Sequence, residues 1–397
     1  MSSLADHPAS IEALLNELAK MSPRQREIRL QDQSTDQRQI LLDSVELRKK
    51  TLSKLPPSER WYLVTRRSLQ QATAWQVAHW KASRFPLGQT LTDVCSGIGG
   101  DAITLAKAHE VQCIERDTIV LECLRWNLST HLSREVSIET RDFDASCVTP
   151  GGYLHIDPDR RALANGKETR TINVDRFSPS LTQILPAIER SQGSIVKLAP
   201  GTHVDVSMRD GIHAWISLAG EVREHAWMVG QLRHSFNESR AAVMLNREAE
   251  AISFCADMIE ETDTIDTPCR FLIDPDAAIR ASGLTVAFAS HHHLKVLHSP
   301  AGFLTADEIP ADVLNMSIIG EVVWQGSADL RRLKRELRLR HAHVESIKDR
   351  TGIPDAARRL KLPSKKQEIP LTLWLARKTN SHGIYAALTK SVAAFGS

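Results

Sequence analysis

Apolar residues follow two different spacings along the middle of the chain. Short apolar runs, each about as long as a strand, are followed by segments in which apolar residues recur with helical spacing. Strands that alternate with helices are typical of a parallel sheet with helices packed against it. The pattern therefore predicts an α/β fold over residues 89–256, with strands at 91–94, 111–115, 136–140, 153–156 and 194–199. Runs at 214–218 and 241–245 are expected to complete the sheet, with a helix at 222–234 between them.

The segments on either side of this region have other patterns. Before the first strand, helical spacing begins at Ile11, prolines at 23 and 56 end helical runs, and residues 61–85 predict a long or broken helix. We expect residues 1–88 to form a helical N-terminal region. After an acidic stretch at 256–269, residues 270–392 predict a small α+β domain. Its expected helices are 277–294, 328–339 and 354–360, and its expected strands lie near 296 and 303 and at 321–324, 344–348, 371–376 and 383–388.

Composition adds few constraints to this picture. A chain of 397 residues is long enough for two or three domains, and with 42% hydrophobic and 25% charged residues it has no apolar run long enough to cross a bilayer. The first residues lack the basic and apolar parts of a secretory signal, so we expect a cytoplasmic protein. Six scattered cysteines without a C-x-x-C pair are expected to be buried thiols in a reducing compartment.

The strand at 91–94 leads into a turn of small residues that is the main candidate for a ligand site. Gly97, Gly99 and Gly100 have no Cβ, so a ligand can approach the main chain there. A dinucleotide site would place a pyrophosphate at the start of the following helix, where this chain has Asp101. A carboxylate repels a diphosphate and favours an ammonium or a sulfonium, and Asp93 at the strand end adds a second carboxylate.

Acids also follow the next two strands. Glu115 is placed to accept hydrogen bonds from ribose hydroxyls, and Asp142 to accept one from an adenine amino group. With Asp93, these residues put a carboxylate at three successive strand ends. S-adenosylmethionine carries an ammonium, a sulfonium, a ribose and an adenine but no phosphate, so this set of acids predicts a site for it.

Four motifs resemble those of class I S-adenosylmethionine-dependent methyltransferases: DVCSGIGGD at 93–101, CIERD at 113–117, RDFD at 141–144 and HIDPDRR at 155–161. Three further stretches, at 71–85, 194–201 and 330–350, resemble the members that carry a C-terminal THUMP-like domain. The resemblance implies a Rossmann-like sheet between a helical N-terminal region and an α+β THUMP-like domain. It also implies S-adenosylmethionine as cofactor, held by Asp93, Cys95, Gly97, Gly99, Asp101, Glu115, Arg116, Asp142, Phe143 and Asp157.

The fourth motif supplies the expected catalytic residues. Methyl transfer is an in-line displacement, and a carboxylate or carbonyl at this strand end can orient the acceptor and manage its proton. We assign these roles to Asp157 and the carbonyl of Pro158. The relatives that methylate exocyclic amines have a second proline and an aromatic where this chain has Asp159 and Arg160. Arg160 is therefore expected to contact a phosphate or carboxylate instead.

A cysteine nucleophile and a metal ion are both disfavoured. None of the six cysteines follows a later strand in a motif that would supply an activated thiolate. The adjacent residues His291, His292 and His293 would point in different directions on a helix, and no cysteine or acid completes a metal site with them.

A strongly basic segment near the C-terminal end predicts contact with RNA, although the net charge of the chain is only +2. Its residues are Arg331, Arg332, Lys334, Arg335, Arg338 and Arg340 on one expected helix, then Lys348, Arg350, Arg358, Arg359, Lys361, Lys365 and Lys366. The leucines of the helix are expected to pack inward. The sequence thus favours a methyltransferase of structured RNA, tRNA or rRNA, without a membrane partner. A small-molecule methyltransferase and an RNA-binding protein that binds the cofactor without catalysis remain alternatives.

Overall fold

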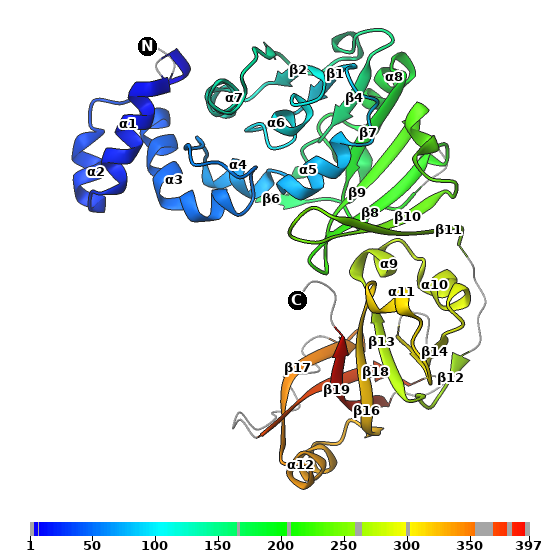
Figure 1. Ribbon diagram of the computed structural model, residues 1–397. Coiled ribbons are helices and arrows are strands. Elements are labelled where there is room, and N and C mark those ends of the chain that lie inside the picture. Colours follow the sequence, from blue (N-terminus) through cyan, green and yellow to red (C-terminus); the bar gives the residue numbers. More distant parts are fainter. Residues whose placement is uncertain are drawn as a thin grey trace. The chain divides into compact units, whose positions relative to one another are not determined.

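The computed structural model describes residues 4–6, 8–164, 167–204, 208–258, 264–298, 302–353, 368–378 and 383–393 (Figure 1). The chain divides into two compact units, one of residues 1–213 and 224–237, the other of residues 214–223 and 238–397. The helix expected at 354–360 and five of the basic residues lie outside the described residues, namely Arg358, Arg359, Lys361, Lys365 and Lys366.

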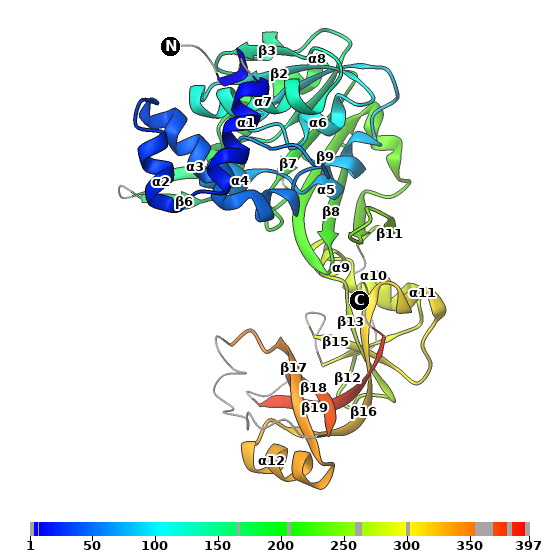
Figure 2. The same ribbon diagram turned by 60° about the vertical axis from the view of Figure 1, so that its left-hand side comes forward.

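The first unit begins with helices, as expected. They are η1 (Leu4–Asp6), α1 (Pro8–Ala19), α2 (Pro23–Arg29), α3 (Thr35–Leu52), α4 (Arg66–Gln71) and α5 (Trp75–Ala82). The segment at 61–85 is a loop followed by two short helices rather than one long helix. Thr65 caps α4 by accepting a hydrogen bond from the backbone N–H of Ser68, so the helix begins only after residue 65. Figure 2 shows α1 to α4 grouped together in this unit.

A parallel sheet with helices forms the rest of the first unit, and it confirms the α/β prediction. Strands β7, β4, β1, β2 and β3 lie in that order and pair in parallel. Because β2 and β3 are added on one side of β1 while β4 and β7 are added on the other, the order reverses between β1 and β4. Ligands of such sheets bind at this reversal, outside the carboxyl ends of the strands. The elements are β1 (Thr90–Val94), α6 (Ala102–Leu105), β2 (Glu110–Glu115), α7 (Thr118–His131), β3 (Ser137–Thr140), η2 (Ala145–Cys147), β4 (Tyr153–Ile156), η3 (Val174–Arg176), α8 (Leu181–Arg190) and β7 (Gly193–Leu198).

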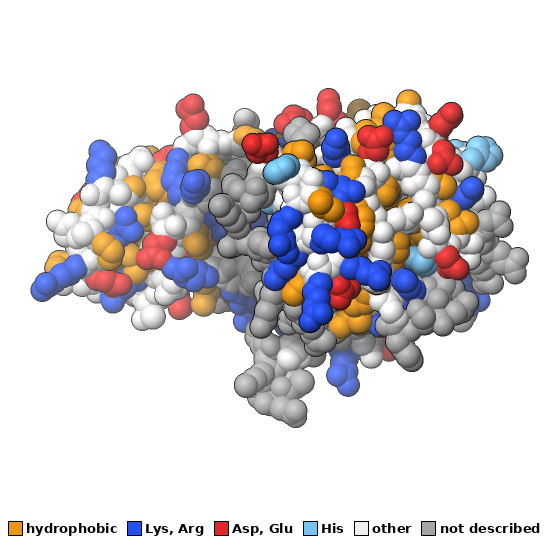
Figure 3. Space-filling view, turned by 90° about the horizontal axis from the view of Figure 1, so that it is seen from below, with side chains coloured by type: hydrophobic (Ala, Val, Ile, Leu, Met, Phe, Trp, Pro, Cys, Tyr) orange, Lys and Arg blue, Asp and Glu red, His pale blue; other side chains and the backbone are white. Residues whose placement is uncertain are grey.

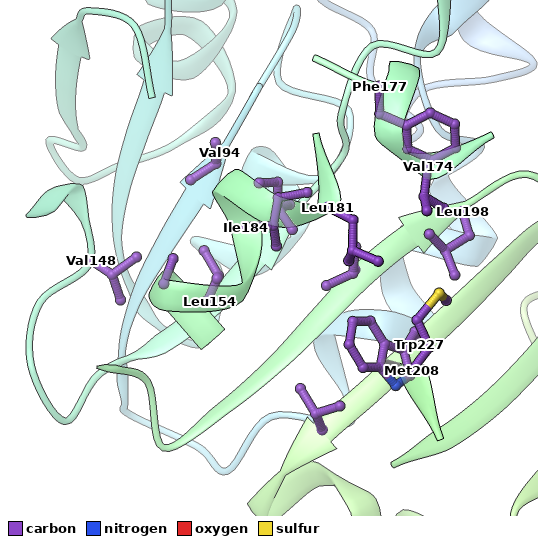
Figure 4. Packing of buried hydrophobic residues seen from close by; sticks show 14 residues of the cluster. Val94, Val148, Leu154, Val174, Phe177, Leu181, Ile184, Leu198, Met208 and Trp227 are labelled. Atoms are coloured by element: carbon purple, nitrogen blue, oxygen red, sulfur yellow. The ribbon is translucent and has the colours of Figure 1, made fainter. Parts of the chain in front are cut away.

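Apolar packing on α8 fixes the strand ends next to the reversal (Figure 4). Leu181 and Ile184 of α8 are buried in one cluster with Val94, Leu154 and Leu198 from strands β1, β4 and β7. Each fully buried side chain of this size contributes about 1.5–3 kcal/mol relative to exposure. The residues that follow Val94 and Ile156 are therefore attached to strand ends whose side chains are tightly packed.

The prediction of a helix at 222–234 is wrong. Strand β8 (Ile212–Leu218) is followed by strand β9 (Glu221–Gly230) and the short helix η5 (Gln231–Ser235), and β9 pairs with β7 in antiparallel register. Residues 224–229 are all buried, as in a strand covered on both faces. A strand buried on both faces lacks the alternation of apolar and polar residues by which a strand is recognised in a sequence, so the pattern did not separate strand from helix here.

Residues 161–170 form a hairpin that the sequence pattern did not predict. Strands β5 (Arg161–Ala164) and β6 (Lys167–Arg170) pair in antiparallel register. Asn165-Gly166 between them is the strongest short sequence signal for a two-residue hairpin turn, and it could have predicted this element.

The second unit contains the hairpin strands β10 (Arg240–Leu245) and β11 (Ala251–Ala256) and an eight-stranded sheet of order β12-β14-β15-β13-β16-β19-β18-β17. The helix expected at 277–294 is two short helices, α9 (Ala277–Ala281) and α10 (Thr285–His291). The remaining elements are β12 (Thr264–Ile265), β13 (Phe271–Pro275), β14 (Lys295–Leu297), β15 (Phe303–Ala306), α11 (Ala311–Leu314), β16 (Ser317–Ser327), α12 (Leu330–Leu339), β17 (Ala342–Arg350), β18 (Ile369–Arg377) and β19 (Ile384–Ala393). Across the described parts of both units, every helix is too short or too polar to cross a bilayer.

Candidate functional site

The turn after β1 exposes its backbone to open space. Cys95, Gly97 and Gly99 have φ angles of 60°, 57° and 90°. A Cβ added to Gly97 would meet no atom within 4 Å, whereas one added to Gly99 would lie 3.1 Å from Cδ1 of Leu124. Packing against α7 therefore favours glycine at position 99. At position 97 the left-handed backbone favours glycine, and the space beside it is free of protein atoms.

Glu115 shapes this turn from the end of β2. Its Oε2 accepts a hydrogen bond from the backbone N–H of Gly97 at 2.9 Å, and its Oε1 accepts from the N–H groups of Arg116 and Asp117 at 2.9 Å each. Burial raises the pKa of the Glu115 carboxyl, and the three backbone donors oppose that shift. The carboxylate is thus fixed beside the open space at Gly97.

Asp93 and Asp101 belong to a buried network of charged side chains. His155 on β4 donates from Nδ1 to Oδ1 of Asp93 at 2.6 Å and accepts at Nε2 from Nζ of Lys81 at 3.0 Å. Lys81 comes from α5 and also lies 2.9 Å from Asp101 Oδ1 and 3.0 Å from Glu224 Oε1. A buried cation at the centre therefore connects α5 to the strand β1, to the start of α6 and to β9.

The sequence predicts Asp101 as a free carboxylate, but in the structure Lys81 pairs with it. Burial by itself raises the pKa of the Asp101 carboxyl, but the charges of Lys81, His155 and Lys197 outweigh burial and hold it well below its usual range. Burial by itself lowers the pKa of Lys81, because it disfavours the charged amine. The negative charges of Asp101 and Glu224 outweigh burial and raise this pKa above its usual range. Asp101 and Lys81 are therefore both charged at neutral pH.

The fourth motif lies at the same edge of the sheet, since β1 pairs with both β2 and β4. Asp157 follows β4, and its Oδ2 accepts a hydrogen bond from Nζ of Lys197 at 2.6 Å; Lys197 also donates to Thr73. Pro158 is buried, and Arg160 is partly buried. The expected acceptor-binding residues thus stand beside the glycine turn.

Arg116 and Asp142 lie at the outer part of this edge. Nη1 of Arg116 is 3.6 Å from Oδ1 of Asp142, and both side chains are largely exposed. Phe143 is partly buried against the core under α8. Asp142 is therefore open to a ligand, while Phe143 anchors the loop that carries it.

The Cys95 thiol has no environment that would activate it. Burial, followed by the charges of Glu115, Asp157 and Asp93, raises its pKa well above the ordinary value. The thiol stays protonated, so it is a poor nucleophile.

Sequence reasoning missed the cations that organise this site. Lys81, His155 and Lys197 are buried, and His155 and Lys197 lie in runs of apolar residues in which a polar side chain has to find a partner. Such a position is the signal that could have singled them out: Tyr-Leu-His-Ile for His155 and Ile-Val-Lys-Leu for Lys197. Only the fold shows which partners they meet.

Comparisons with known proteins agree with this geometry. No family model matches the chain. Two curated relatives from Mycobacterium tuberculosis, strains CDC 1551 and H37Rv, are each 28% identical over 305 residues, which is 75% of this chain and 80% of the relative. Both are described as uncharacterized S-adenosylmethionine-dependent methyltransferases.

Among solved structures, a protein from Porphyromonas gingivalis W83, provisionally classed as a methyltransferase, superposes with a TM-score of 0.74 at 16% identity, covering 97% of this chain and 98% of that one. The chain has a methyltransferase fold. This methyltransferase fold places the glycine turn, Glu115 and Asp157 where the sheet order reverses.

Proposed function

We propose that this chain, an S-adenosylmethionine-dependent methyltransferase, acts on structured RNA, either tRNA or rRNA. The relatives that align over most of the chain carry the name of this enzyme class, and they support the assignment of the methyl donor. The observation that carries the RNA assignment is the basic surface of α12 in the second unit. A tRNA or rRNA substrate would place the reaction in the cytoplasm.

The residues at the sheet edge fit the donor. The open space at Gly97 leaves room for a ligand against the main chain, and the fixed carboxylate of Glu115 faces the same turn as an acceptor for ribose hydroxyls. When bound there, the cofactor supplies an electrophilic methyl group on a sulfonium. We assign its adenine to Asp142 and its methionine end to Asp93 and Gly97. The full set of proposed cofactor residues is Asp93, Cys95, Gly97, Gly99, Asp101, Glu115, Arg116, Asp142, Phe143 and Asp157.

Asp157 and the Pro158 carbonyl orient the acceptor in this proposal. Lys197 holds Oδ2 of Asp157, which fixes the direction of the carboxylate and leaves Oδ1 to accept a hydrogen bond from the acceptor group. Arg160 lies in the same loop as Asp157 and Pro158 and supplies a guanidinium for a phosphate of the substrate. Most of the rate enhancement would come from placing acceptor and donor in line.

Gly97→Ala separates the role of the turn in binding from its role in folding. Because the added Cβ meets open space, we expect only the cost of a left-handed backbone at a residue with a Cβ, about 1–2 kcal/mol of stability. The cofactor would clash with the methyl group, so its affinity should fall by more than tenfold. Calorimetric titration with S-adenosylmethionine, together with urea unfolding, measures both quantities. Unchanged affinity would place the ligand elsewhere.

α12 presents a basic face to solvent and an apolar face to the sheet of the second unit. Leu333 and Leu337 are buried in one cluster with strands β17, β18 and β19, whereas Leu339 is 68% exposed and does not pack inward as expected. Figure 3, a view from below, shows a group of Lys and Arg side chains on the surface that faces the viewer. The exposed basic residues of the helix are Arg331, Arg332, Arg335 and Arg338, and Lys334 is partly buried.

Two further residues of the expected RNA surface have a structural partner. Lys348 Nζ and Arg350 Nη2 lie 3.5 and 3.0 Å from the buried carboxylate of Asp274, which Arg280 also contacts at 2.8 Å. Three cations therefore surround one buried carboxylate, while Glu345 and Asp349 of β17 balance the charges of Lys348 and Arg350. We propose that residues 270–392 form a THUMP-like domain in which α12 binds RNA phosphates, with Lys348 and Arg350 as further candidate contacts.

Replacing three outward-facing cations of α12 tests the RNA surface. Arg331→Gln, Arg332→Gln and Arg338→Gln together should weaken RNA binding about tenfold or more and reduce the slope of log affinity against log salt by about 2–3. Binding of labelled tRNA and rRNA at several salt concentrations gives both values. A matched variant of three exposed cations in the first unit, Lys20→Gln, Arg24→Gln and Lys50→Gln, should change little; an equal loss in both variants would mean that α12 has no special part.

Transfer of a labelled methyl group tests the function itself. The full chain is incubated with methyl-labelled S-adenosylmethionine and RNA from cells that lack the protein, and the RNA nucleosides are analysed by mass spectrometry. Incorporation into one nucleoside of tRNA or rRNA is the expected result. Donor binding without incorporation into any RNA would overturn the RNA assignment.

A further inference from the structure

A hollow in the first unit is lined almost entirely by arginine. Its volume is about 490 Å³, and no Asp or Glu is among the residues that line it. One wall is α4 and the other is the hairpin β5–β6, and both ribbon views place β6 beside α4 (Figures 1 and 2). Four guanidinium groups around one hollow favour an anion with several oxygens. The lining residues are Arg66, Arg67, Gln70, Arg161 and Arg170.

The hairpin itself places two like charges against each other. Arg161 and Arg170 are directly opposite in the antiparallel ladder, so their side chains leave the ladder on the same face. Like charges in this position destabilise a hairpin, and a two-stranded hairpin is only marginally stable even without them. An anion bound between the two guanidinium groups would remove the repulsion.

Carboxylates partly neutralise the α4 wall. Arg66 pairs with Asp43 at 3.2 Å and with Glu46, and Arg67 lies 3.7 Å from Asp159. These acids stand behind or beside α4 rather than in the lining of the hollow. They hold the two arginines in place without filling the hollow.

Hydrogen bonds connect both walls to the loop that carries the proposed acceptor-binding residues. Oδ1 of Asp159 accepts from Gln71 Nε2 at 3.3 Å and from the backbone N–H of Arg161 at 3.1 Å. The carbonyl of Arg160 accepts from the backbone N–H of Thr171 at 2.9 Å. A group bound in the hollow would therefore sit next to residues 157–160.

We propose that this hollow binds phosphodiester groups of the RNA strand that carries the methylated nucleotide. The inference rests on the proposed function and adds a second RNA contact, separate from α12. Phosphate contacts of this kind fix the position of a strand without reading its sequence, so the hollow would set which nucleotide reaches Asp157. The phosphate of a small nucleotide offers the same chemistry, and the experiment distinguishes it from a strand.

The test removes the two opposed charges of the hairpin. In the full chain, Arg161→Gln with Arg170→Gln is compared with Arg125→Gln and Arg190→Gln, two exposed arginines on α7 and α8 of the same unit. We expect the hairpin variant to bind RNA about tenfold more weakly, with a salt slope lower by about 1–2, and to raise KM for RNA more than it lowers kcat. The control pair should bind RNA like the parent protein, and both variants should bind S-adenosylmethionine normally.

Three results would each overturn a different part of the proposal. If the parent methylates RNA and the hairpin variant matches the control pair in affinity and KM, the hollow does not bind the strand although the proposed function stands. If adenosine monophosphate binds the parent but not the hairpin variant, and RNA binding is equal in the two, the phosphate belongs to a small molecule. If the parent transfers no methyl group to any RNA, the proposed function fails, and this inference fails with it. Because the opposed charges cost stability, the hairpin variant should unfold at an equal or higher urea concentration than the parent, so a folding defect will not imitate the expected loss.

Discussion

Glu115→Ala is expected to lower the affinity for S-adenosylmethionine about 100-fold. A hydrogen bond to a charged group is worth about 1.5–3 kcal/mol, and Glu115, whose carboxylate already accepts three backbone N–H groups, is proposed to use its remaining lone pair for a ribose hydroxyl. The same carboxylate fixes the backbone of Gly97, so its loss also loosens the turn on which the ligand lies. Calorimetric titration of the purified protein measures the change.

A second substitution and a control make this result specific. Glu115→Gln keeps one oxygen acceptor but loses the charge, and we expect it to bind about tenfold more weakly than the parent. Glu110→Ala removes an exposed glutamate at the other end of the same strand and should bind normally. If Glu115→Ala binds the donor as tightly as Glu110→Ala, the cofactor does not use this carboxylate.

The same carboxylate predicts how donor binding depends on pH. Burial raises the pKa of Glu115, so on acidification it takes up a proton at a higher pH than an exposed glutamate does. The protonated form is a poorer acceptor for the ribose. Donor affinity should therefore fall as the pH drops toward 5, and this loss should be absent in Glu115→Gln.

Local pattern predicted the elements that carry the ligand better than it predicted their surroundings. The strand, turn and helix at 91–105 follow from an apolar run, small residues and helical spacing, all within one short window. The run at 222–230 was predicted as a helix but belongs to strand β9, and burial of that strand on both faces depends on neighbours far along the chain. The hairpin at 161–170 was missed although Asn165-Gly166 marks it.

The role of Asp101 shows why part of the site could not be predicted. The sequence places a carboxylate after the glycine turn, and that much is local. The partner that neutralises it, Lys81, comes from a helix of the N-terminal region, and a further carboxylate, Glu224, comes from a strand more than a hundred residues later. Pairing of this kind is fixed by how the elements pack, so the sequence pattern gives no direct signal for it.

Lys81→Met is expected to cause the largest loss of stability among these substitutions. It would leave Asp101 and Glu224 as buried carboxylates without their cation, and breaking a buried pair from one side costs about 3–5 kcal/mol. Lys107→Met, an exposed lysine close to the start of β2, should have little effect. Urea unfolding of the three proteins at neutral pH provides the comparison.

The dependence of that loss on pH follows from the charges involved. In the parent, the lowered pKa of Asp101 contributes stability that is present at neutral pH and is lost only as the pH falls through the folded-state value. The raised pKa of Lys81 contributes stability that persists until strongly alkaline pH. In Lys81→Met, Asp101 loses the cation that lies closest to it, so its carboxyl takes up a proton more readily than in the parent. The difference in unfolding free energy between parent and variant should therefore be largest near pH 8 and should shrink toward pH 5.

Removing one carboxylate as well should recover part of the loss. Lys81→Met with Glu224→Gln has one buried charge fewer than the single variant, so we expect it to be more stable than Lys81→Met alone. The two changes would then be strongly non-additive, as expected for residues in direct contact. Because Lys81 also contacts His155, which holds Asp93, the rescued variant should still bind S-adenosylmethionine more weakly than the parent. Additive effects in this cycle, or a loss that does not change between pH 8 and pH 5, would show that the buried cation does not stabilise the two carboxylates.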